Sequence, residues 1–303
     1  MPTKIPARFT NEDAARKHLE RLQWPDGPIC PHCGTIDRAS RIQGGRKGLW
    51  FCNACREQFT VTVGTVFERS HVPLQTWLYA NHLICSSKKG ISSHQLSRML
   101  GVSYKTAWFM AHRIREAMAP AKNAKPIGGE GKTVEADEMY IGNKSGVKKH
   151  PGAGGYAHKM AILSLVERGG SVRSVPLDSA SRPEIRAAMD KTIRAKTRVI
   201  TEGAQMYRFL PALQHETVNH SVGEYVRGDV HTNTVEGVFS IFRRGMIGTY
   251  QHCGEQHLHR YLAEFDFRYS NRAKLGIDDA TRADLALMGA KGKRLTYRRT
   301  SEA

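Results

Sequence analysis

The sequence has no long apolar run. Among its 303 residues, 40% of them hydrophobic, no stretch approaches the roughly 18 apolar residues of a membrane-spanning helix. The first residues, Met1–Asp13, have no apolar core of the kind that marks a secretory signal peptide. We therefore expect a cytoplasmic protein, and a chain of this length can form two domains with a sizeable core.

Acidic residues are scarce relative to basic ones. The 46 Lys and Arg residues outnumber the 28 Asp and Glu residues, which gives a net charge of +18. The excess is concentrated in residues 1–125, which hold 19 basic and 8 acidic side chains. A strongly basic chain favours a polyanionic partner. We expect that partner to be DNA, although the charge by itself also fits a ribosomal or RNA-binding protein.

Four of the six cysteines form two closely spaced pairs. Two residues separate Cys30 from Cys33 and Cys52 from Cys55, and eighteen residues lie between the pairs. This is the spacing of a zinc ribbon, in which each pair supplies two thiolates and the pairs together close a tetrahedral site. Disulfides are disfavoured in the cytosol, and a redox site needs one such pair, not two. The pattern therefore predicts a structural zinc ion that stabilises a segment too small for its own core.

Two helices separated by a glycine are predicted after the cysteines. Ser93–Leu100 is expected as the first helix and Gly101 as the turn. Ser103 is the expected N-cap of a second helix, Tyr104–Met118. This order is typical of a helix-turn-helix, whose second helix meets base edges with its N-terminal side chains, but an ordinary helical hairpin has the same pattern. The side chains expected to contact DNA from this helix are Lys105, Thr106, Trp108, Arg113 and Arg115.

Strand patterns dominate after residue 132. Ala119–Lys132, rich in Pro, Gly and Lys, is a predicted linker. The order β-β-β-α-β-α-β-α beyond it predicts an α/β fold with a mixed sheet and helices on both faces. The strands expected along the chain are Phe59–Phe67, Thr133–Ile141, Met160–Val166, Val172–Leu177, Thr197–Thr201 and Thr217–Asn219, and a short helix is expected over Ala204–Leu213.

Three acidic residues lie where a metal-dependent nuclease or strand transferase needs its ligands. Asp137 is inside a predicted strand, Glu202 follows the end of another, and Glu236 is in the first turn of a predicted helix. Carboxylates from such distant positions converge only if the fold brings them together, and hard oxygen ligands suit magnesium-type ions in phosphoryl chemistry. We predict that the three side chains hold two magnesium or manganese ions.

Each of these acids also has a structural explanation. A charge such as Asp137 can protect an edge strand from aggregation, and Glu202 could begin the next helix. Asn233 and Glu236 form a capping-box pattern, with Asn233 as the N-cap and Glu236 at the third helical position. Spacing alone does not decide between capping and catalysis for Glu236.

Three motifs resemble those of bacterial insertion-sequence transposases. They are Val134–Gly142, His231–Gly237 and His257–Tyr269. The resemblance is closest to the insertion-sequence 1595 family, whose members combine a zinc ribbon with a DDE domain, and it extends from about Phe9 to Arg272. It implies that the catalytic domain has a ribonuclease H-like fold.

The resemblance also implies site residues. Asp137 corresponds to the first catalytic acid and Glu236 to the third, with Asn233 beside it. The second acid is usually Asp in such transposases, whereas Glu202 stands in its place here. The added methylene moves the oxygens by roughly 1 Å, a misplacement that can cost on the order of a hundredfold in rate. We therefore expect reduced activity. The alternatives are a catalytically inactive DNA-binding relative that acts as a regulator, and a zinc-ribbon transcription factor of other origin.

The predicted protein is a DNA transposase that binds terminal inverted repeats and catalyses strand cleavage and strand transfer. Its expected partners are double-stranded DNA on the bacterial nucleoid and a second copy of the chain, because two element ends are cleaved. Basic side chains expected to follow the phosphate backbone from outside the helix-turn-helix are Lys144, Lys148, Lys149, Lys159 and Arg243. The expected domains are an N-terminal helix and zinc ribbon (1–67), a helical DNA-binding region (68–125), a ribonuclease H-like DDE domain (126–275) and a basic C-terminal tail (276–303).

Overall fold

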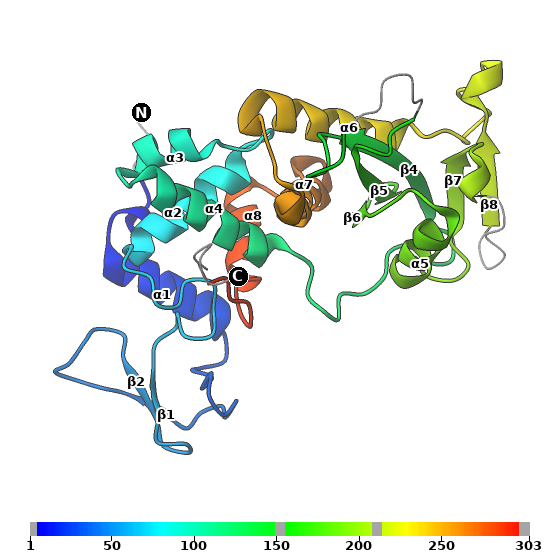
Figure 1. The fold of residues 1–303 in the computed structure, drawn as a ribbon. Coiled ribbons are helices and arrows are strands. Elements are labelled where there is room, and N and C mark those ends of the chain that lie inside the picture. The colour runs from blue at the N-terminus through cyan, green and yellow to red at the C-terminus, as the bar shows by residue number, and fades with distance from the viewer. Residues whose placement is uncertain (1–4, 149–154, 208–213, 297–303) are drawn as a thin grey trace. The chain divides into compact units, whose positions relative to one another are not determined.

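The chain divides into two compact units. The computed structural model describes residues 5–148, 155–207 and 214–296 (Figure 1). Unit 1 comprises residues 1–87, 91–119 and 278–303, and unit 2 comprises residues 88–90 and 120–277. The predicted ribbon and helical region both belong to unit 1, so the finer division between them at residue 67 remains a prediction. Within the described ranges, no helix has the length and apolarity that crossing a bilayer requires.

Unit 1 is mainly helical, and four of its described α-helices begin at a residue whose side chain caps the helix. The Ser103 hydroxyl accepts a hydrogen bond from the Thr106 N–H at 3.2 Å, which satisfies a donor that the helix cannot. Gly101 ends the preceding helix at φ +65°, a conformation that favours glycine. The two helices predicted around this glycine are thus confirmed. The helical elements of unit 1 are η1 (Ala7–Phe9), α1 (Glu12–Gln23), α2 (Leu74–Ser86), α3 (Ser93–Leu100), α4 (Tyr104–Met118) and α8 (Asp279–Met288).

A small antiparallel sheet carries the cysteine pairs. Its strands are β1 (Ala39–Arg41), β2 (Trp50–Cys52) and β3 (Gln58–Phe59), in that order. The predicted strand Phe59–Phe67 is wrong beyond its first residue, because the Thr-rich segment folds into successive turns. In these turns the N–H groups of Val63 and Thr65 bond to carbonyls three residues earlier, at 3.1 and 3.2 Å.

The C-terminal segment differs from the tail that we expected over residues 276–303. It contains α8, which packs against α2 and α1. The Asn81 side chain donates to the Ala283 carbonyl at 2.8 Å, and the Gln23 side chain donates to the Leu287 carbonyl at 2.6 Å. Short apolar side chains on one face of α8 are buried, and the basic residues around them concealed this face in the sequence.

Unit 2 is built on a mixed five-stranded sheet, as predicted. Its strand order is β6-β5-β4-β7-β8; β4 is antiparallel to β5 and parallel to β7, and β7 is parallel to β8. The strands are β4 (Thr133–Ile141), β5 (Met160–Glu167), β6 (Val172–Leu177), β7 (Arg198–Glu202) and β8 (Gln214–Val218). The strands β4, β7 and β8 are parallel, so their C-terminal ends point to the same end of the sheet. Residues near those ends can therefore become neighbours.

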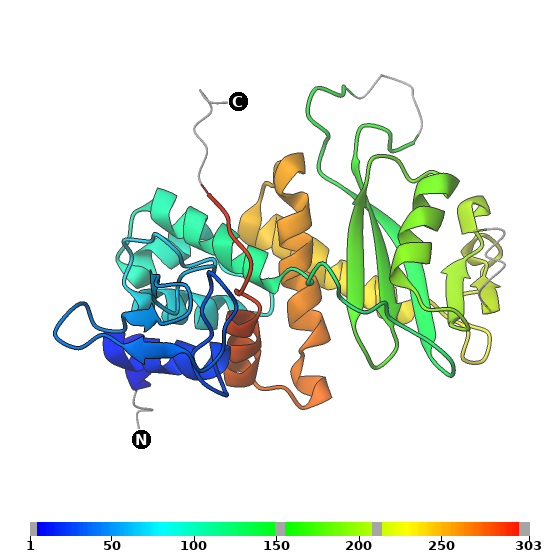
Figure 2. The same cartoon turned by 90° about the horizontal axis from the view of Figure 1, so that it is seen from below.

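Helices cover both faces of this sheet. Figure 2 shows α5 on one side and α6 and α7 on the other. Strand alternation assigns Met139 and Ile162 to the core under α6 and α7, and Val134 and Leu163 to the core under α5. The remaining elements of unit 2 are α5 (Arg182–Thr192), η2 (Gln205–Tyr207), η3 (His220–Val222), α6 (Asn233–Gly245), the π-helical turn η4 (Met246–Tyr250), η5 (Glu255–His257), α7 (Leu258–Ser270) and η6 (Ala273–Leu275).

One expected helix of unit 2 is only partly described. The prediction placed it over Ala204–Leu213, and the structure has the single turn η2 at its start. Residues 208–213 of the expected helix lie outside the described residues.

Two candidate metal centres and the candidate DNA-binding residues

The four paired cysteines converge on one point in unit 1. The Sγ atoms of Cys30 and Cys55 are 3.6 Å apart, and those of Cys33 and Cys52 are 3.7 Å apart. These distances are far longer than the roughly 2.05 Å of a disulfide. They match the roughly 3.8 Å edge of a tetrahedron with zinc–sulfur bonds of about 2.3 Å. The thiols therefore fit a structural zinc ion.

The pKa values of these thiols also favour a bound cation. A hydrogen bond from the Thr35 side chain, with a second from its backbone, lowers the pKa of Cys33 to about 6. The Glu57 N–H favours the Cys55 thiolate, but burial and the neighbouring sulfurs outweigh it and raise the pKa of Cys55 to about 12. Four thiolates cannot share this volume without a compensating positive charge, and a bound dication supplies that charge.

The predicted acids lie near the C-terminal end of β7 in unit 2, beside the middle of the central strand β4. Asp137 is on β4 and Glu202 ends β7. The register that pairs Ala136 with Thr201 makes Asp137 and Glu202 neighbours across these parallel strands. Glu236 belongs to the first turn of α6, which packs against β4. Carboxylate oxygens of Glu202 and Glu236 lie within 4.8 Å of each other.

The charges of these acids interact. Burial, together with the negative charges of Glu202, Glu138 and Glu236, raises the pKa of Asp137 to about 8. One Asp137 oxygen accepts a hydrogen bond from the Glu138 N–H at 2.8 Å. Carboxylates that oppose one another's ionisation are stabilised by a cation between them. The oxygen donors present here fit magnesium or manganese.

A buried carboxylate, Glu135, holds the start of α6. Its side chain is fully buried and accepts hydrogen bonds from the Thr234 N–H at 2.7 Å and the Val235 N–H at 3.0 Å. It also accepts from the Thr234 hydroxyl at 2.7 Å and from Nε of Arg168 at 2.6 Å. Glu135 is two residues before Asp137, and the turn that it caps carries Glu236. This carboxylate therefore fixes two of the predicted acids relative to each other.

The structure corrects the predicted cap of α6. The N-cap position is occupied by Thr232, and Asn233 is the first helical residue, with an exposed side chain. Glu236 does not reach back to a backbone N–H as a capping box requires; its carboxylate accepts a bond from the Thr232 hydroxyl at 3.2 Å. Capping by Glu135 leaves the exposed Glu236 side chain able to take another role.

Sequence reasoning missed Glu135, Arg168 and His220. Strand alternation puts Glu135 on the same face of β4 as Asp137. Because Asp137 and Glu138 are also acidic, the sequence does not indicate which of the three is buried. A buried carboxylate needs hydrogen-bond partners or an ion pair, and the partner here, Arg168, lies 33 residues away. His220 has no spacing signal in the sequence, because it reaches the acids only through the turn that follows β8.

The predicted DNA-contacting residues of α4 fall into two groups. Lys105 is exposed, and Thr106 and Trp108 are partly exposed, so the N-terminal end of the helix is accessible. With Tyr104 they line an open cavity of about 820 Å³. The ring of Tyr104 stacks on His94 of α3 at a centroid distance of 4.3 Å.

The expectation for Arg113 and Arg115 is wrong. Both are buried, at 7% and 1% exposure. Arg113 donates to the backbone carbonyls of Leu295 at 3.0 Å and Glu68 at 3.1 Å. The two residues are two positions apart and so lie on nearly opposite sides of α4, but the helix is packed on both sides at this point, and neither side chain can follow a phosphate backbone.

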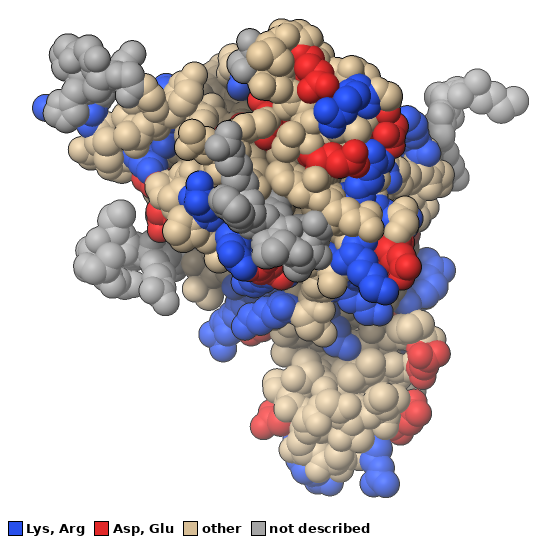
Figure 3. Space-filling view, turned by 90° about the vertical axis from the view of Figure 1, so that its right-hand side faces the viewer, with Lys and Arg blue, Asp and Glu red and all other residues tan. Residues whose placement is uncertain are grey.

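The basic residues of unit 2 that were predicted to contact DNA differ in their exposure. Lys148 and Arg243 are exposed, whereas Lys149 lies outside the described residues. Lys144 donates to the Asp178 carbonyl, and Lys159 is half-buried. Figure 3 shows Lys and Arg interspersed with Asp and Glu on the face that it displays. Mixed charge of this kind gives weaker attraction to a polyanion than the basic excess of residues 1–125.

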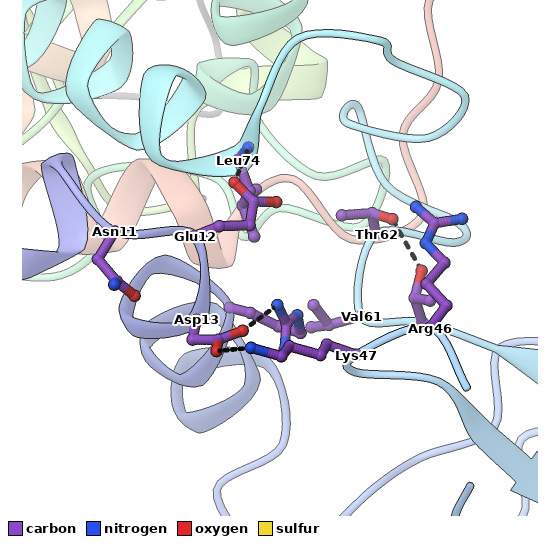
Figure 4. A pocket seen from close by; sticks show the side chains of 10 residues that line it. Asn11, Glu12, Asp13, Arg46, Lys47, Val61, Thr62 and Leu74 are labelled. Atoms are coloured by element: carbon purple, nitrogen blue, oxygen red, sulfur yellow. Dashed lines mark hydrogen bonds and ion pairs between the residues drawn. The ribbon is translucent and has the colours of Figure 1, made fainter. Parts of the chain in front are cut away.

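A second cavity of unit 1, of about 460 Å³, contains a charged network rather than metal ligands. Figure 4 shows Asp13 directed toward the side chain of Lys47. The distance is 3.1 Å, and Arg16 contacts the same carboxylate at 2.6 Å. These contacts, Arg16 first, lower the pKa of Asp13. The neighbouring Glu12 accepts the Leu74 N–H at 2.7 Å. The network ties α1 to the loop of the cysteine sheet and to α2.

The sheet order, the helices on both faces and the acids on β4, β7 and α6 define unit 2 as a ribonuclease H-like domain. Comparison with known families agrees: residues 128–270 match the model of the ISXO2-like transposase domain, and residues 10–58 match the transposase zinc-ribbon domain. The chain is also 32% identical over 288 residues to an "Uncharacterized protein in transposable element ISH50" of Halobacterium salinarum, covering 88% of this chain and 93% of that one. The chain belongs to the insertion-sequence 1595 family of transposases.

Membership of this family defines the protein as a transposase with a DDE-type domain of the polynucleotidyl transferase class. The zinc-ribbon match and the cysteine geometry together support a structural zinc ion at Cys30, Cys33, Cys52 and Cys55. Family membership also implies that the protein binds DNA.

Proposed function

We propose that the protein is the transposase of an insertion sequence, which binds the terminal inverted repeats of its element and catalyses strand cleavage and strand transfer. The observation that carries this proposal is that acids of β7 and α6 lie within 4.8 Å of each other, beside an acid on the neighbouring strand β4. These positions are separated in the sequence by 65 and 34 residues (Asp137, Glu202 and Glu236). A fold under no functional constraint gains nothing from placing mutually repelling carboxylates together.

In the proposed reaction Asp137, Glu202 and Glu236 provide the oxygen ligands for two magnesium or manganese ions. When bound, such ions stabilise the charge on the attacking and leaving oxygens of an in-line phosphoryl displacement. Asp137 and Glu202 hold their carboxylates at a fixed separation because hydrogen-bonded strands carry them. Glu236 approaches from α6, whose position is fixed by Glu135. Asn233, exposed one turn earlier, is placed to contact the DNA strand.

Duplex DNA is the proposed partner of unit 1. The basic excess of residues 1–125 supplies attraction to phosphates, and the accessible start of α4 offers Lys105, Thr106 and Trp108 to a groove. Lys148 and Arg243 are the exposed basic residues proposed to contact DNA near the acids. Because two ends are processed, we propose that two copies of the chain assemble on DNA.

The test is a strand-cleavage and strand-transfer assay with magnesium, using duplexes taken from the sequences on either side of the coding region. Glu236→Gln keeps the size of the side chain but removes its charge. We expect it to lower the cleavage rate by at least about a thousandfold, a loss of roughly 4 kcal/mol of transition-state stabilisation.

The matched control is Glu130→Gln, which removes an 82% exposed carboxylate of the same unit that forms a surface ion pair with Lys196. It should cleave at the parent rate. Cleavage by Glu236→Gln at the parent rate would refute the assignment of the site.

A further inference from the structure

His220 lies beside the acids although no motif predicted a role for it. It follows the end of β8 by two residues, and Glu202 ends the neighbouring parallel strand, where the register pairs it with Val218. Nδ1 of His220 is 3.1 Å from Oε1 of Glu202. The two side chains are 22% and 34% exposed, so the position is open to solvent on one side.

One donor atom from each of Glu202, His220 and Glu236 lies within 4.8 Å of the other two. Donors at about 2.1 Å from a single ion are roughly 3 Å apart when adjacent and roughly 4.2 Å apart when opposite. The His220–Glu202 distance has the adjacent value, and the whole set needs only a small contraction to surround one ion. Within the described residues, the only other group with such convergence is the cysteine cluster.

The imidazole is held in place by its surroundings. The His220 carbonyl accepts the Gly223 N–H at 3.1 Å, and the Val222 N–H bonds to Asn219 at 3.3 Å, which fixes the turn. The ring also packs on Tyr225 at a centroid distance of 4.7 Å. A histidine placed only to neutralise Glu202 would not need to direct a donor toward Glu236 as well, whereas a ligand must.

We infer that His220 is a direct nitrogen ligand of the divalent ion that Glu202 and Glu236 hold, an inference that rests on the proposed function. The longer side chain of Glu202 agrees with this, because its extra methylene carries the carboxylate to the imidazole. An imidazole ligand favours transition metals, whereas magnesium prefers oxygen donors and keeps several waters. The site should therefore prefer Mn²⁺ to Mg²⁺ by more than an all-carboxylate site does.

The experiment measures metal binding by the full-length, zinc-loaded protein without DNA. Mn²⁺ affinity is obtained from the electron paramagnetic resonance signal of free Mn²⁺, and Mg²⁺ affinity by competition. Pulsed measurements on bound Mn²⁺ report whether a nitrogen nucleus is coordinated. We expect a nitrogen coupling in the parent and its loss in His220→Ala. Mn²⁺ affinity should fall at least about tenfold in that variant, and Mg²⁺ affinity by less than about threefold, because water can replace the ligand.

His220→Asp keeps a ligand at this position but supplies oxygen. It should bind Mn²⁺ more tightly than His220→Ala and show no nitrogen coupling, which separates the loss of a ligand from damage to the turn. His252→Ala removes an exposed histidine of the same unit and should match the parent in every measurement.

Three outcomes are distinguishable. Unchanged nitrogen coupling and Mn²⁺ affinity in both His220 variants, with binding abolished by Glu236→Gln, would overturn this inference and leave the proposed function standing. Unchanged binding in Glu236→Gln as well would overturn both. Loss of the coupling and of the preference for Mn²⁺ in the His220 variants alone would establish the ligand.

Discussion

The two candidate metal centres differ in how completely the protein surrounds them. The cysteine cluster has four soft ligands from two adjacent turns, two of them buried, at the spacing of a closed tetrahedron. The acidic cluster has candidate ligands from four separate elements, all of them at least partly exposed, although burial raises the pKa of Asp137. Closed sites stabilise a fold, whereas open sites leave positions for water or substrate.

This difference predicts opposite responses to change. A tetrahedral thiolate site loses its ion when one ligand is lost, and the small sheet around it has little core of its own. The acidic site is built on a five-stranded sheet that is already stable, so changes there should alter chemistry and leave the fold intact.

The largest expected effect comes from loss of the zinc site. Cys52→Ser should abolish stoichiometric zinc and unfold residues 30–59, since metal binding contributes on the order of 10 kcal/mol in small zinc domains. Unit 2 should keep its thermal transition, as followed by calorimetry with zinc content measured on the same sample. Cys253→Ala, at a buried cysteine of unit 2, is the control and should retain zinc. One zinc ion per chain in Cys52→Ser would contradict the four-cysteine site.

An intermediate effect is expected for Glu135→Gln, which tests whether the acidic site depends on its cap. An amide nitrogen in place of Oε2 would face the N–H donors of Thr234 and Val235, and in place of Oε1 it would face the guanidinium of Arg168, so at least one donor loses its acceptor. We expect a loss of about 2 to 3 kcal/mol in the free energy of unfolding. The cleavage kcat should fall about ten- to a hundredfold through misplacement of Glu236, with KM for DNA unchanged.

Glu138→Gln is the matched control for this change. Glu138 is on the same strand but on the other face, where it accepts the Tyr207 hydroxyl at 2.5 Å. An amide can still accept that bond, so stability should change little. Because the change removes a negative charge that raises the pKa of Asp137 without moving Glu236, kcat should change far less than in Glu135→Gln. A higher KM for DNA with an unchanged kcat in Glu135→Gln would show that the buried Glu135 serves DNA binding and does not position Glu236.

The smallest effect is expected for Glu202→Asp, which introduces the residue that the family resemblance leads us to expect at this position. Shortening the side chain withdraws the carboxylate from His220 by roughly 1 Å, so we expect the cleavage rate to fall about tenfold. This reverses the expectation drawn from the sequence, in which Glu202 lowers activity, because that expectation did not include His220. An inactive regulator predicts the reverse, a gain of cleavage over a silent parent. A single-turnover assay with magnesium and with manganese decides between the two.

Much of this arrangement was predictable from local patterns. The cysteine spacing, the Ser103 cap with Gly101 and the strand β4 each depend on residues close together in the sequence. The order of strands and helices was enough to predict a mixed sheet, because hairpins and α/β alternation leave few topologies. The family resemblance supplied the assignments of Asp137 and Glu236.

What failed depended on contacts that no local pattern encodes. Arg113 and Arg115 have the composition of a DNA-binding helix, but tertiary packing turned them inward. Asn233 lies in a capping-box sequence, but the carboxylate of Glu135, on strand β4, accepts the hydrogen bond from the start of α6 instead. His220 reaches the acids only because β8 lies beside β7. These outcomes are set by long-range packing, which overrides propensity.

The course of the chain has a consequence for synthesis. Unit 1 begins at the first residues and is completed by α8, after the whole of unit 2 has been translated. Until then Asn81 and Gln23 lack the Ala283 and Leu287 carbonyls that they bond in the finished protein. Products shortened before residue 278 would lack this closing helix. Because unit 1 is the proposed DNA-binding part, we expect such products to bind DNA less well than the chain that contains α8.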